Sequence, residues 1–408
     1  MPFIMLVVLI DMVSIGLIIP VLPALVGTFT ASPEEQAYWY GAVGFAFGLA
    51  SFIGSPIMGA LSDRFGRRPV LLLGFSGLAL SFFVTALATQ LWMLIAVRLV
   101  AGALMANAAV AQAYVADITP PEQRARRFGL LGAMFGLGFI LGPVMGGLLG
   151  HIDLHWPFFV AGGLALLNGL YGYFVLPESL PPERRQPFDW HKANPVGSLK
   201  ALVALRGVGL LVVVIGLSAL AQFILHTTWV LYTQMKFGWG PMENGWSLFL
   251  VGVMSALVQG WLVGRLLKRW SAQGLAVAAL VSATVCYAMW GAATEGWMMY
   301  AVIVANVLGY CAQPAIQSLV SNAADPQAQG QAMGGLAGLN SLMAVVAPVV
   351  GPPMLGVVSH LPQGDWRVGA PYYFCALLLA AATLVALRHF ARQPLPHPAD
   401  PATAGTTP

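Results

Sequence analysis

Three ionisable side chains interrupt the long apolar runs of this sequence: Asp11, Arg98 and His226. A charged side chain at the centre of a bilayer costs about 2.5–3.5 kcal/mol on insertion scales, so such residues are rare and mark functional sites. Burial favours the protonated form of a carboxylic acid, which suits Asp11 to bind and release a proton near physiological pH. The alternative for Asp11 is structural, as part of a buried pair or as a helix cap.

The two basic side chains differ in what they can do. Arg98 keeps its charge and does not exchange protons readily, but it can hold a carboxylate ionised or attract an oxyanion. Its alternative role is an anchor hydrogen-bonded to carbonyls of neighbouring helices. An unperturbed histidine titrates at about pH 6.5, so His226 can relay a proton, although a lone intramembrane histidine also fits a structural role. We expect Asp11 and His226 to bind and release protons.

Transmembrane helices are the elements that must position these side chains. Hydrophobic residues make up 58% and charged residues 8% of the 408 positions, whereas a soluble chain carries about a quarter charged residues. The apolar runs have the length of a spanning helix, about 20 residues, and lack the alternation of barrel strands. The three cysteines fall inside these runs, so no disulfide framework is expected. The N-terminus has no basic segment before its apolar run, which favours a first span over a signal peptide.

Hydropathy and helix breakers predict twelve spans. They cover roughly residues 3–26, 38–61, 70–89, 91–116, 128–150, 156–176, 209–233, 244–266, 272–293, 297–320, 333–357 and 370–391. A polar segment divides these spans six and six. We therefore predict an N-terminal six-helix bundle (1–178), a cytoplasmic linker (179–208), a C-terminal six-helix bundle (209–393) and a disordered tail (394–408).

The basic residues are distributed asymmetrically between the two sides of the predicted membrane. Sixteen of the 19 Lys and Arg residues lie in the linker, in the loops after spans two, four and eight, and after span twelve. Two lie on the opposite side, and Arg98 lies within a span. The positive-inside rule therefore places both termini in the cytoplasm.

The two halves of the sequence repeat at an offset of 205 residues. The offset superposes several turn and kink residues: Gly59 on Gly264, Val115 on Val320, Pro121 on Pro326, Pro143 on Pro348, and Gly146 on Gly351. A duplicated six-helix unit predicts an all-α membrane protein of two pseudo-symmetric six-helix bundles. In transporters with this architecture the substrate site lies between the repeats.

Four segments of the sequence match signatures of a known family. They are Asp11-Met-Val-Ser-Ile-Gly-Leu-Ile-Ile-Pro-Val-Leu-Pro23, residues 59–68, Leu94 to Gly102 around Arg98, and Gly138-Phe-Ile-Leu-Gly-Pro-Val-Met-Gly-Gly147. The chain resembles the twelve-span drug–proton antiporters of the major facilitator superfamily, and within them the tetracycline efflux antiporters. The resemblance covers nearly the whole chain and implies the major facilitator fold. Its fourth-span motif implies that Arg98 takes part in proton coupling with Asp11 and His226, and its fifth-span motif implies export.

The loop 59–68 concentrates charge in an otherwise apolar chain, and the resemblance implies that it is a conformational lock. Its members are Gly59, Asp63, Arg64, Gly66, Arg67 and Arg68, together with Asp117 at the end of span four. We expect Asp63 to cap the eleventh span near Met333, where the helix dipole favours an anion, and Arg67 to pair with Asp117. The lock would hold the two halves together on the cytoplasmic side in the outward-facing state. A role in topology alone accounts for the arginines but not for Asp63 or the two glycines.

Span five carries the antiporter motif, Gly138, Gly142, Pro143, Gly146 and Gly147. Small residues four apart allow close helix approach, and proline bends a helix. The resemblance implies a tight contact with the opposite half that seals the cavity against leak. Ordinary small-residue packing is the alternative.

Polar and aromatic residues within the spans are candidates for a substrate cavity. They are Asn107, Gln112, Gln222, Trp229, Gln259, Gln313 and Asn340. Hydrogen bonding between helices is the alternative for the amides, and packing is the alternative for Trp229. The chain departs from the tetracycline exporters at Ser81, Ser255 and Ala283, where those proteins carry an acidic residue, a histidine and an aspartate.

The function implied by the resemblance is proton-coupled efflux of a drug or other amphipathic small molecule, tetracycline-like above all, by alternating access. The implied partners are the drug, protons and membrane lipid, with no nucleic acid, and the protein is expected as a monomer in the bacterial inner membrane. The proton gradient is the energy source, with no cofactor and no metal. An uptake symporter or uniporter of a small metabolite is the alternative.

Gly74-Phe-Ser-Gly77 resembles an intramembrane serine-protease motif. A motif of four residues recurs by chance, and we expect no enzyme.

Overall fold

The computed structural model describes residues 2–105, 107–188, 209–323 and 329–392. Eleven helices in this part of the chain are long and apolar enough to cross a membrane. The helices Gly296–Ala305 and Gly309–Leu319 meet at a bend of 52° and, counted as one broken span, make the twelfth. The prediction of an all-α, twelve-span membrane protein is confirmed. Most of the predicted linker and the whole predicted tail lie outside the described residues.

The helices follow the predicted order. The first half contains α1 (Pro2–Ile18), α2 (Leu22–Gly27), α3 (Pro33–Phe65), α4 (Arg67–Ala86), α5 (Leu91–Leu104), α6 (Asn107–Asp117), α7 (Pro121–Ile152), α8 (Trp156–Val175) and the short η1 (Pro182–Arg184). The second half contains α10 (Gly209–Phe237), α11 (Pro241–Leu257), η2 (Val258–Leu262), α12 (Val263–Leu266), α13 (Ala272–Ala292), α14 (Gly296–Ala305), η3 (Gly309–Cys311), α15 (Ala312–Ala323), α16 (Gln329–Val358), η4 (Trp366–Gly369) and α17 (Ala370–Arg392).

Four predicted spans are interrupted rather than continuous. Span one breaks between α1 and α2, around Pro20, which lacks the amide hydrogen that would continue the helix. Span four is divided into α5 and α6, and the hydroxyl of Ser55 donates to the carbonyl of Met105 at this division. Span eight contains the π-helical turn η2, and span ten is bent. Such interruptions are common where transporters place functional groups.

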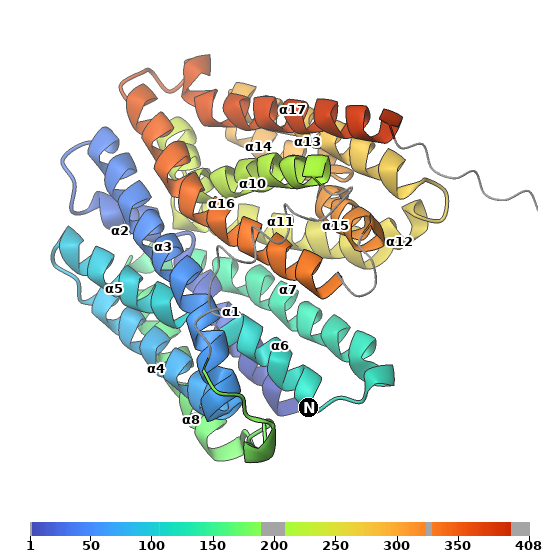
Figure 1. The fold of residues 1–408 in the computed structure, drawn as a ribbon. Coiled ribbons are helices and arrows are strands. Elements are labelled where there is room, and N and C mark those ends of the chain that lie inside the picture. Colours follow the sequence, from blue (N-terminus) through green and yellow to red (C-terminus); the bar gives the residue numbers. More distant parts are fainter. Residues whose placement is uncertain (1, 106, 189–208, 324–328, 393–408) are drawn as a thin grey trace, which may run out of the picture.

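The two halves form separate bundles with their own apolar cores. In the N-terminal bundle (α1–α8), α1 packs against α7 and α8, and α4 packs against α8. In the C-terminal bundle (α10–α17), α10 packs against α16 and α17, and α13 packs against α17. Figure 1 shows the two bundles side by side, one in blue to green and the other in yellow-green to red. Except for Ala37, the buried residues of the second core come from the C-terminal half.

The repeat seen in the sequence recurs in the packing. A Cβ at Gly146 would lie 1.9 Å from the carbonyl oxygen of Leu17 in α1, and a Cβ at Gly351 would lie 2.7 Å from Thr228 in α10. Each glycine therefore allows its helix to press against the first helix of its own bundle. Gly146 and Gly351 are one of the pairs related by the 205-residue offset.

The bundles touch one another at one end of the molecule. A Cβ at Gly245 of α11 would lie 2.6 Å from the carbonyl oxygen of Pro143 in α7. The symmetry-related contact is between α3 and α16, where a Cβ at Gly41 would lie 2.7 Å from the carbonyl oxygen of Pro348. Figure 1 shows α3 and α16 running alongside one another. We call this region the closed end.

The opposite ends of the same helices lack such contacts. Four glycines, Gly59 on α3, Gly136 on α7, Gly264 on α12 and Gly334 on α16, have no atom of the described residues within 4 Å of where a Cβ would stand. The loops at this end carry the basic residues that the sequence places on one side of the membrane. The two bundles therefore part toward their basic loops, which we call the open end.

Candidate functional site

Asp11 lies within the N-terminal bundle and is 2% exposed. The side-chain nitrogen of Asn107, on α6, donates to Oδ1 of Asp11 at 3.2 Å and lies 3.4 Å from Oδ2. A small cavity of about 10 Å³ adjoins both residues and is lined also by Phe75 and Phe135. Asp11 therefore has one amide donor and otherwise apolar surroundings, which suits a carboxylate that gains and loses a proton.

Gly74 makes room for the amide of Asn107. A Cβ at Gly74 would lie 1.9 Å from Oδ1 of Asn107, closer than any real contact. The motif that resembled a protease signature thus has a packing explanation, because α4 must approach α6 closely at this point. One turn further on, Gly77 makes room for Leu104, because a Cβ there would lie 2.2 Å from the side chain of Leu104.

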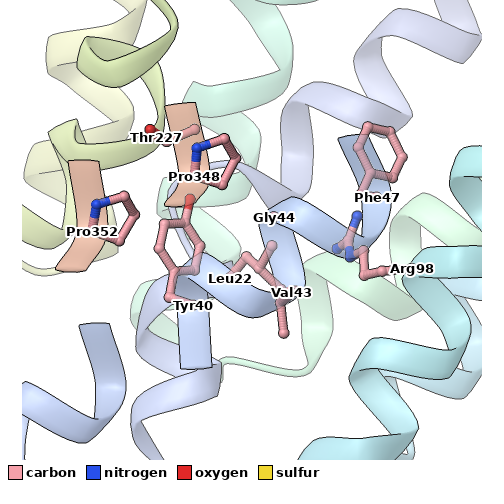
Figure 2. A pocket seen from close by; sticks show the side chains of 9 residues that line it. All are labelled: Leu22, Tyr40, Val43, Gly44, Phe47, Arg98, Thr227, Pro348 and Pro352. Carbon is pink, nitrogen blue, oxygen red and sulfur yellow. The ribbon is translucent and has the colours of Figure 1, made fainter. Parts of the chain in front are cut away.

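Arg98 lies in a different cavity, between the two bundles (Figure 2). The cavity has a volume of about 80 Å³ and is lined by Leu22, Tyr40, Val43, Gly44, Phe47, Arg98, Thr227, Pro348 and Pro352. Figure 2 shows the guanidinium of Arg98 directed toward the cavity and toward Phe47, whose ring centroid lies 5.9 Å away. Arg98 is 7% exposed, and its Nη2 has no hydrogen-bond partner among the described residues.

Asp11 and Arg98 therefore lie at different cavities. Within the described chain, no ion pair joins them. Arg98 lies in α5 and Asn107 is the first residue of α6, so the two are on opposite sides of the break in span four. The carboxylate is beside Asn107, whereas the guanidinium is nearer the closed end.

His226 belongs to a short hydrogen-bond chain in the C-terminal bundle. Its Nε2 lies 2.8 Å from Nε2 of Gln222, and the hydroxyl of Tyr287 donates to Oε1 of Gln222 at 3.0 Å. Because the amide nitrogen of Gln222 can only donate, Nε2 of His226 accepts in this arrangement and the ring proton resides on Nδ1. Sequence reasoning named His226 and Gln222 but missed Tyr287, which lies on another helix, α13.

The other cavity candidates have varied surroundings. Gln112, Gln259 and Gln313 are exposed, and Gln259 donates to the hydroxyl of Ser255 at 2.7 Å. Asn340 is half-buried, and its Oδ1 has no partner among the described residues. These four residues are available to a polar ligand.

Two other cavity candidates, Asn107 and Trp229, are buried. Asn107 is bonded to Asp11 inside the N-terminal bundle, as described above. Trp229 is 4% exposed, its indole nitrogen donates to Ser247 at 2.9 Å, and its ring packs edge-on against Trp290. In this structure the large ring therefore fills the interior of the C-terminal bundle.

Two of the positions at which the chain differs from the tetracycline exporters, Ser81 and Ala283, are uncharged and buried. Ser81 is buried, and its hydroxyl has no partner among the described residues. Ala283 is buried in the apolar core of the C-terminal bundle. Asp11, Arg98 and His226 remain the ionisable residues that the sequence predicts to take part in coupling.

The loop 59–68 forms the predicted network within the N-terminal bundle. Nε of Arg67 lies 3.2 Å from Oδ2 of Asp117, and Nη1 of Arg67 lies 2.7 Å from Oδ1 of Asp63. Arg67 thus joins the loop to the end of span four, as predicted. The predicted cap on the eleventh span cannot be followed, because the side chains around Met333 lie outside the described residues. The guanidinium of Arg64 lies over the ring of Phe65.

Glu178 completes this network and was missed from the sequence. Its carboxylate accepts hydrogen bonds from the backbone amides of Arg67 (2.8 Å), Arg68 (3.3 Å), Ser179 (2.9 Å) and Leu180 (3.0 Å). An acceptor at the first turn of α4 satisfies amides that have no partner within the helix. Glu178 is the last residue of the predicted N-terminal bundle (1–178), immediately before the predicted linker, and its charge was a visible signal.

Gly66 is required by the backbone between α3 and α4. Its φ is +105°, a conformation that residues with a Cβ rarely adopt. A Cβ would also lie 2.3 Å from the carboxylate of Glu178. Gly66 therefore allows the turn that brings Glu178 to the start of α4.

The antiporter-motif glycines face two different neighbours. Gly138, Gly142 and Gly146 pack against α1, within the same bundle. A Cβ at Gly147 would lie 2.6 Å from the carbonyl oxygen of Pro241 and 3.0 Å from Cα of Gly245, both on α11 of the other bundle. Contact with the opposite half is thus made by Gly147 and by the carbonyl of Pro143, while the other three glycines hold α7 against α1.

Comparisons with known proteins agree with this geometry. A profile of the Major Facilitator Superfamily matches residues 4–348. The chain is 38% identical over 368 residues to the tetracycline resistance protein, class C, of Escherichia coli, covering 90% of this chain and 92% of that protein. It is 34% identical to the class B protein of Escherichia coli, with 92% and 94% covered. The crystal structure of the nucleoside transporter NupG, 13% identical, superposes with a TM-score of 0.76 over 95% of this chain and 98% of that chain, a likeness of fold alone.

Proposed function

The chain belongs to the Major Facilitator Superfamily, and from that premise we propose that it exports a tetracycline-like drug in exchange for protons. It is a multi-pass membrane transporter and not an enzyme. The observation that carries the proposal is the similarity of nearly the whole chain to tetracycline resistance proteins. Uptake of a metabolite is less well supported, because several relatives that are 31–38% identical over most of the chain are tetracycline resistance proteins.

The open end faces the cytoplasm in this proposal. The positive-inside rule places the basic loops there, and the chain acts as a monomer in the bacterial inner membrane with both termini in the cytoplasm. The structure then represents the state that receives drug from the cytoplasm. The contacts of Gly147 and of Gly41 with the other bundle seal the opposite side in this state.

Asp11 carries the proton. It takes a proton from outside when the transporter faces outward, and it releases the proton to the cytoplasm when the transporter faces inward. Each proton that moves down a potential of about 100 mV supplies about 2.3 kcal/mol, in addition to the pH gradient. The gradient is the energy source, and the drug must bind more tightly to one state than to the other for the cycle to be driven.

The remaining motifs control the change of state. The lock around Arg67 and Asp117 closes the cytoplasmic side in the outward-facing state, when Asp63 reaches the start of α16. In the inward-facing state the lock is released from the C-terminal bundle, and the Gly147 contact seals the other side. His226, with Gln222 and Tyr287, is a second candidate for proton relay. The exposed amides of Gln112, Gln259 and Gln313 and the half-buried Asn340 face the drug.

Resistance and efflux assays test the proposal. The gene is expressed in a pump-deficient bacterium and challenged with a drug panel that includes tetracycline. The wild-type protein should raise the drug concentration needed to inhibit growth of the bacterium. An uncoupler should increase drug accumulation in cells that express the protein. Asp11→Asn should abolish both effects, whereas Asp153→Asn, which alters an exposed carboxylate paired with His155, should not. Lower accumulation in the presence of the uncoupler would indicate uptake and overturn the proposal, and so would resistance that persists in Asp11→Asn.

A further inference from the structure

The cavity between the bundles contains an unsatisfied cation. Arg98 is 7% exposed, its Nη2 has no partner among the described residues, and Figure 2 shows its guanidinium directed into the cavity. Burying a charge without a partner is costly, and proteins normally offset the cost with a counter-ion. Arg98 takes part in none of the ion pairs found in the described parts of the chain. The position therefore favours an anion from outside the chain.

The size and lining of the cavity limit what that anion can be. A site of roughly 10–15 Å³ holds one water molecule, so the cavity of about 80 Å³ accommodates a group of several heavy atoms. A carboxylate or an ionised enol has that size, and a complete multi-ring drug does not. Phe47, Tyr40 and the ring of Pro348 surround the space, which suits the flat apolar part adjoining such a group.

We propose that Arg98 and the cavity around it form an oxyanion subsite, which binds the delocalised anionic group of an amphipathic organic substrate. The guanidinium presents a planar fork of donors that matches two oxygens of one anion. The remainder of the substrate extends toward the open end. The inference rests on the proposed function, since it names the chemical class of that substrate.

The construction of the subsite from both bundles gives it a part in the transport cycle. Tyr40, Phe47 and Arg98 belong to the N-terminal bundle, and Thr227, Pro348 and Pro352 belong to the C-terminal bundle. When the closed end opens, the contacts of α3 with α16 separate and the cavity loses one of its walls. The subsite is complete only while the transporter faces inward, so affinity for the anion falls when it faces outward. An exporter needs this difference in affinity between the two states.

The test compares two ligands that differ in charge and little else. Purified wild-type protein is titrated with benzoate and with the neutral benzamide. Binding is measured from the rise in the midpoint of thermal unfolding, and from the change in tetracycline fluorescence as bound tetracycline is displaced. Benzoate should bind at least about tenfold more tightly than benzamide, which corresponds to about 1.4 kcal/mol. Equal binding of the two ligands overturns the proposal.

Variants then assign the preference to Arg98. Arg98→Gln should abolish the preference for benzoate, and Arg98→Lys should retain part of it, because lysine keeps the charge without the fork. Arg388→Gln removes an exposed arginine and should bind like wild type. A preference that survives in a folded Arg98→Gln variant overturns the proposal. If Arg98→Gln does not fold, the wild-type comparison and Arg98→Lys decide the question.

The failure of the subsite and the failure of the proposed function give different results. Wild type that prefers benzoate but exports no compound of the drug panel supports the subsite and contradicts the proposed export. Wild type that exports tetracycline but binds benzoate and benzamide equally contradicts the subsite alone.

Discussion

The amide nitrogen of Asn107 lies 3.2 and 3.4 Å from the two carboxylate oxygens of Asp11, joining α6 to α1 across 96 positions of sequence. The contact places the one carboxylate of span one against the first residue of the second half of span four. A change in the protonation of Asp11 therefore alters a hydrogen bond at the break between α5 and α6. We infer that this junction is where proton binding first affects helix position.

Gly74→Ala should slow transport, because the new methyl group would displace Asn107 from Asp11. A Cβ at Gly74 would lie 1.9 Å from Oδ1 of Asn107. Overpacking of this kind costs about 1–3 kcal/mol, and we expect a loss of transport rate of roughly tenfold or more if that cost falls on the Asp11–Asn107 contact. The initial rate of drug-dependent proton movement in everted vesicles measures the effect. Gly163→Ala is the matched control, since no atom lies within 4 Å of a Cβ there, and a Gly74→Ala protein as fast as that control would contradict the prediction.

Gly147→Ala should loosen the closed end. The added methyl group would lie 2.6 Å from the carbonyl oxygen of Pro241 and 3.0 Å from Cα of Gly245, so α7 and α11 must move apart. A cysteine introduced at Thr227, which lines the cavity between the bundles, should then react several-fold faster with an impermeant thiol reagent added outside. The native cysteines are buried and give little background.

Gly136→Ala provides the control for this experiment, because it lies on the same helix with no atom within 4 Å of its Cβ position. Its labelling rate should match that of the Thr227→Cys protein alone. Unchanged labelling in Gly147→Ala would show that the contact between α7 and α11 does not seal the cavity.

Asp63→Asn should slow the transport cycle and leave drug affinity nearly unchanged. Asp63 pairs with Arg67 at 2.7 Å, and its side chain is 47% exposed, so the ion pair contributes little to stability, about 0–1 kcal/mol. In the proposed cycle Asp63 acts in the outward-facing state, where it holds the cytoplasmic side closed. Initial transport rates should fall several-fold while the equilibrium dissociation constant for the drug stays within about twofold, a change of roughly 0.4 kcal/mol. A large loss of affinity would indicate a substrate site instead of a lock.

Glu178→Ala should destabilise the N-terminal bundle without changing drug binding. The carboxylate accepts four backbone amide hydrogens, two of them at the start of α4. Losing a helix cap costs about 0.5–2 kcal/mol, and we expect a loss of stability at the upper part of that range. Thermal unfolding in detergent measures it. Glu183→Ala changes an exposed acid in η1 and should leave the unfolding midpoint in place; equal midpoints for both variants would refute the capping role.

The sequence by itself determined the number of spans, the asymmetry of the basic loops and the duplicated bundle. These properties depend on the order of apolar and charged residues along the chain, because each span must bury its own backbone hydrogen bonds in lipid. The sequence also singled out Asp11 and Arg98, since a charge within a span is costly to retain, and the resemblance to the antiporters implied the pair of Arg67 with Asp117.

Only the tertiary structure decided which of these groups meet. Helical rise and the break after α5 place Asn107, not Arg98, beside Asp11, and leave the guanidinium of Arg98 in the cavity between the bundles. Trp229 was assigned to the cavity because of its type, yet the packing of α10 turns it inward onto Trp290. Glu178 caps a helix that begins 111 residues earlier. Such contacts depend on helix rotation and on glycines that permit close approach, which the linear pattern of hydropathy does not encode.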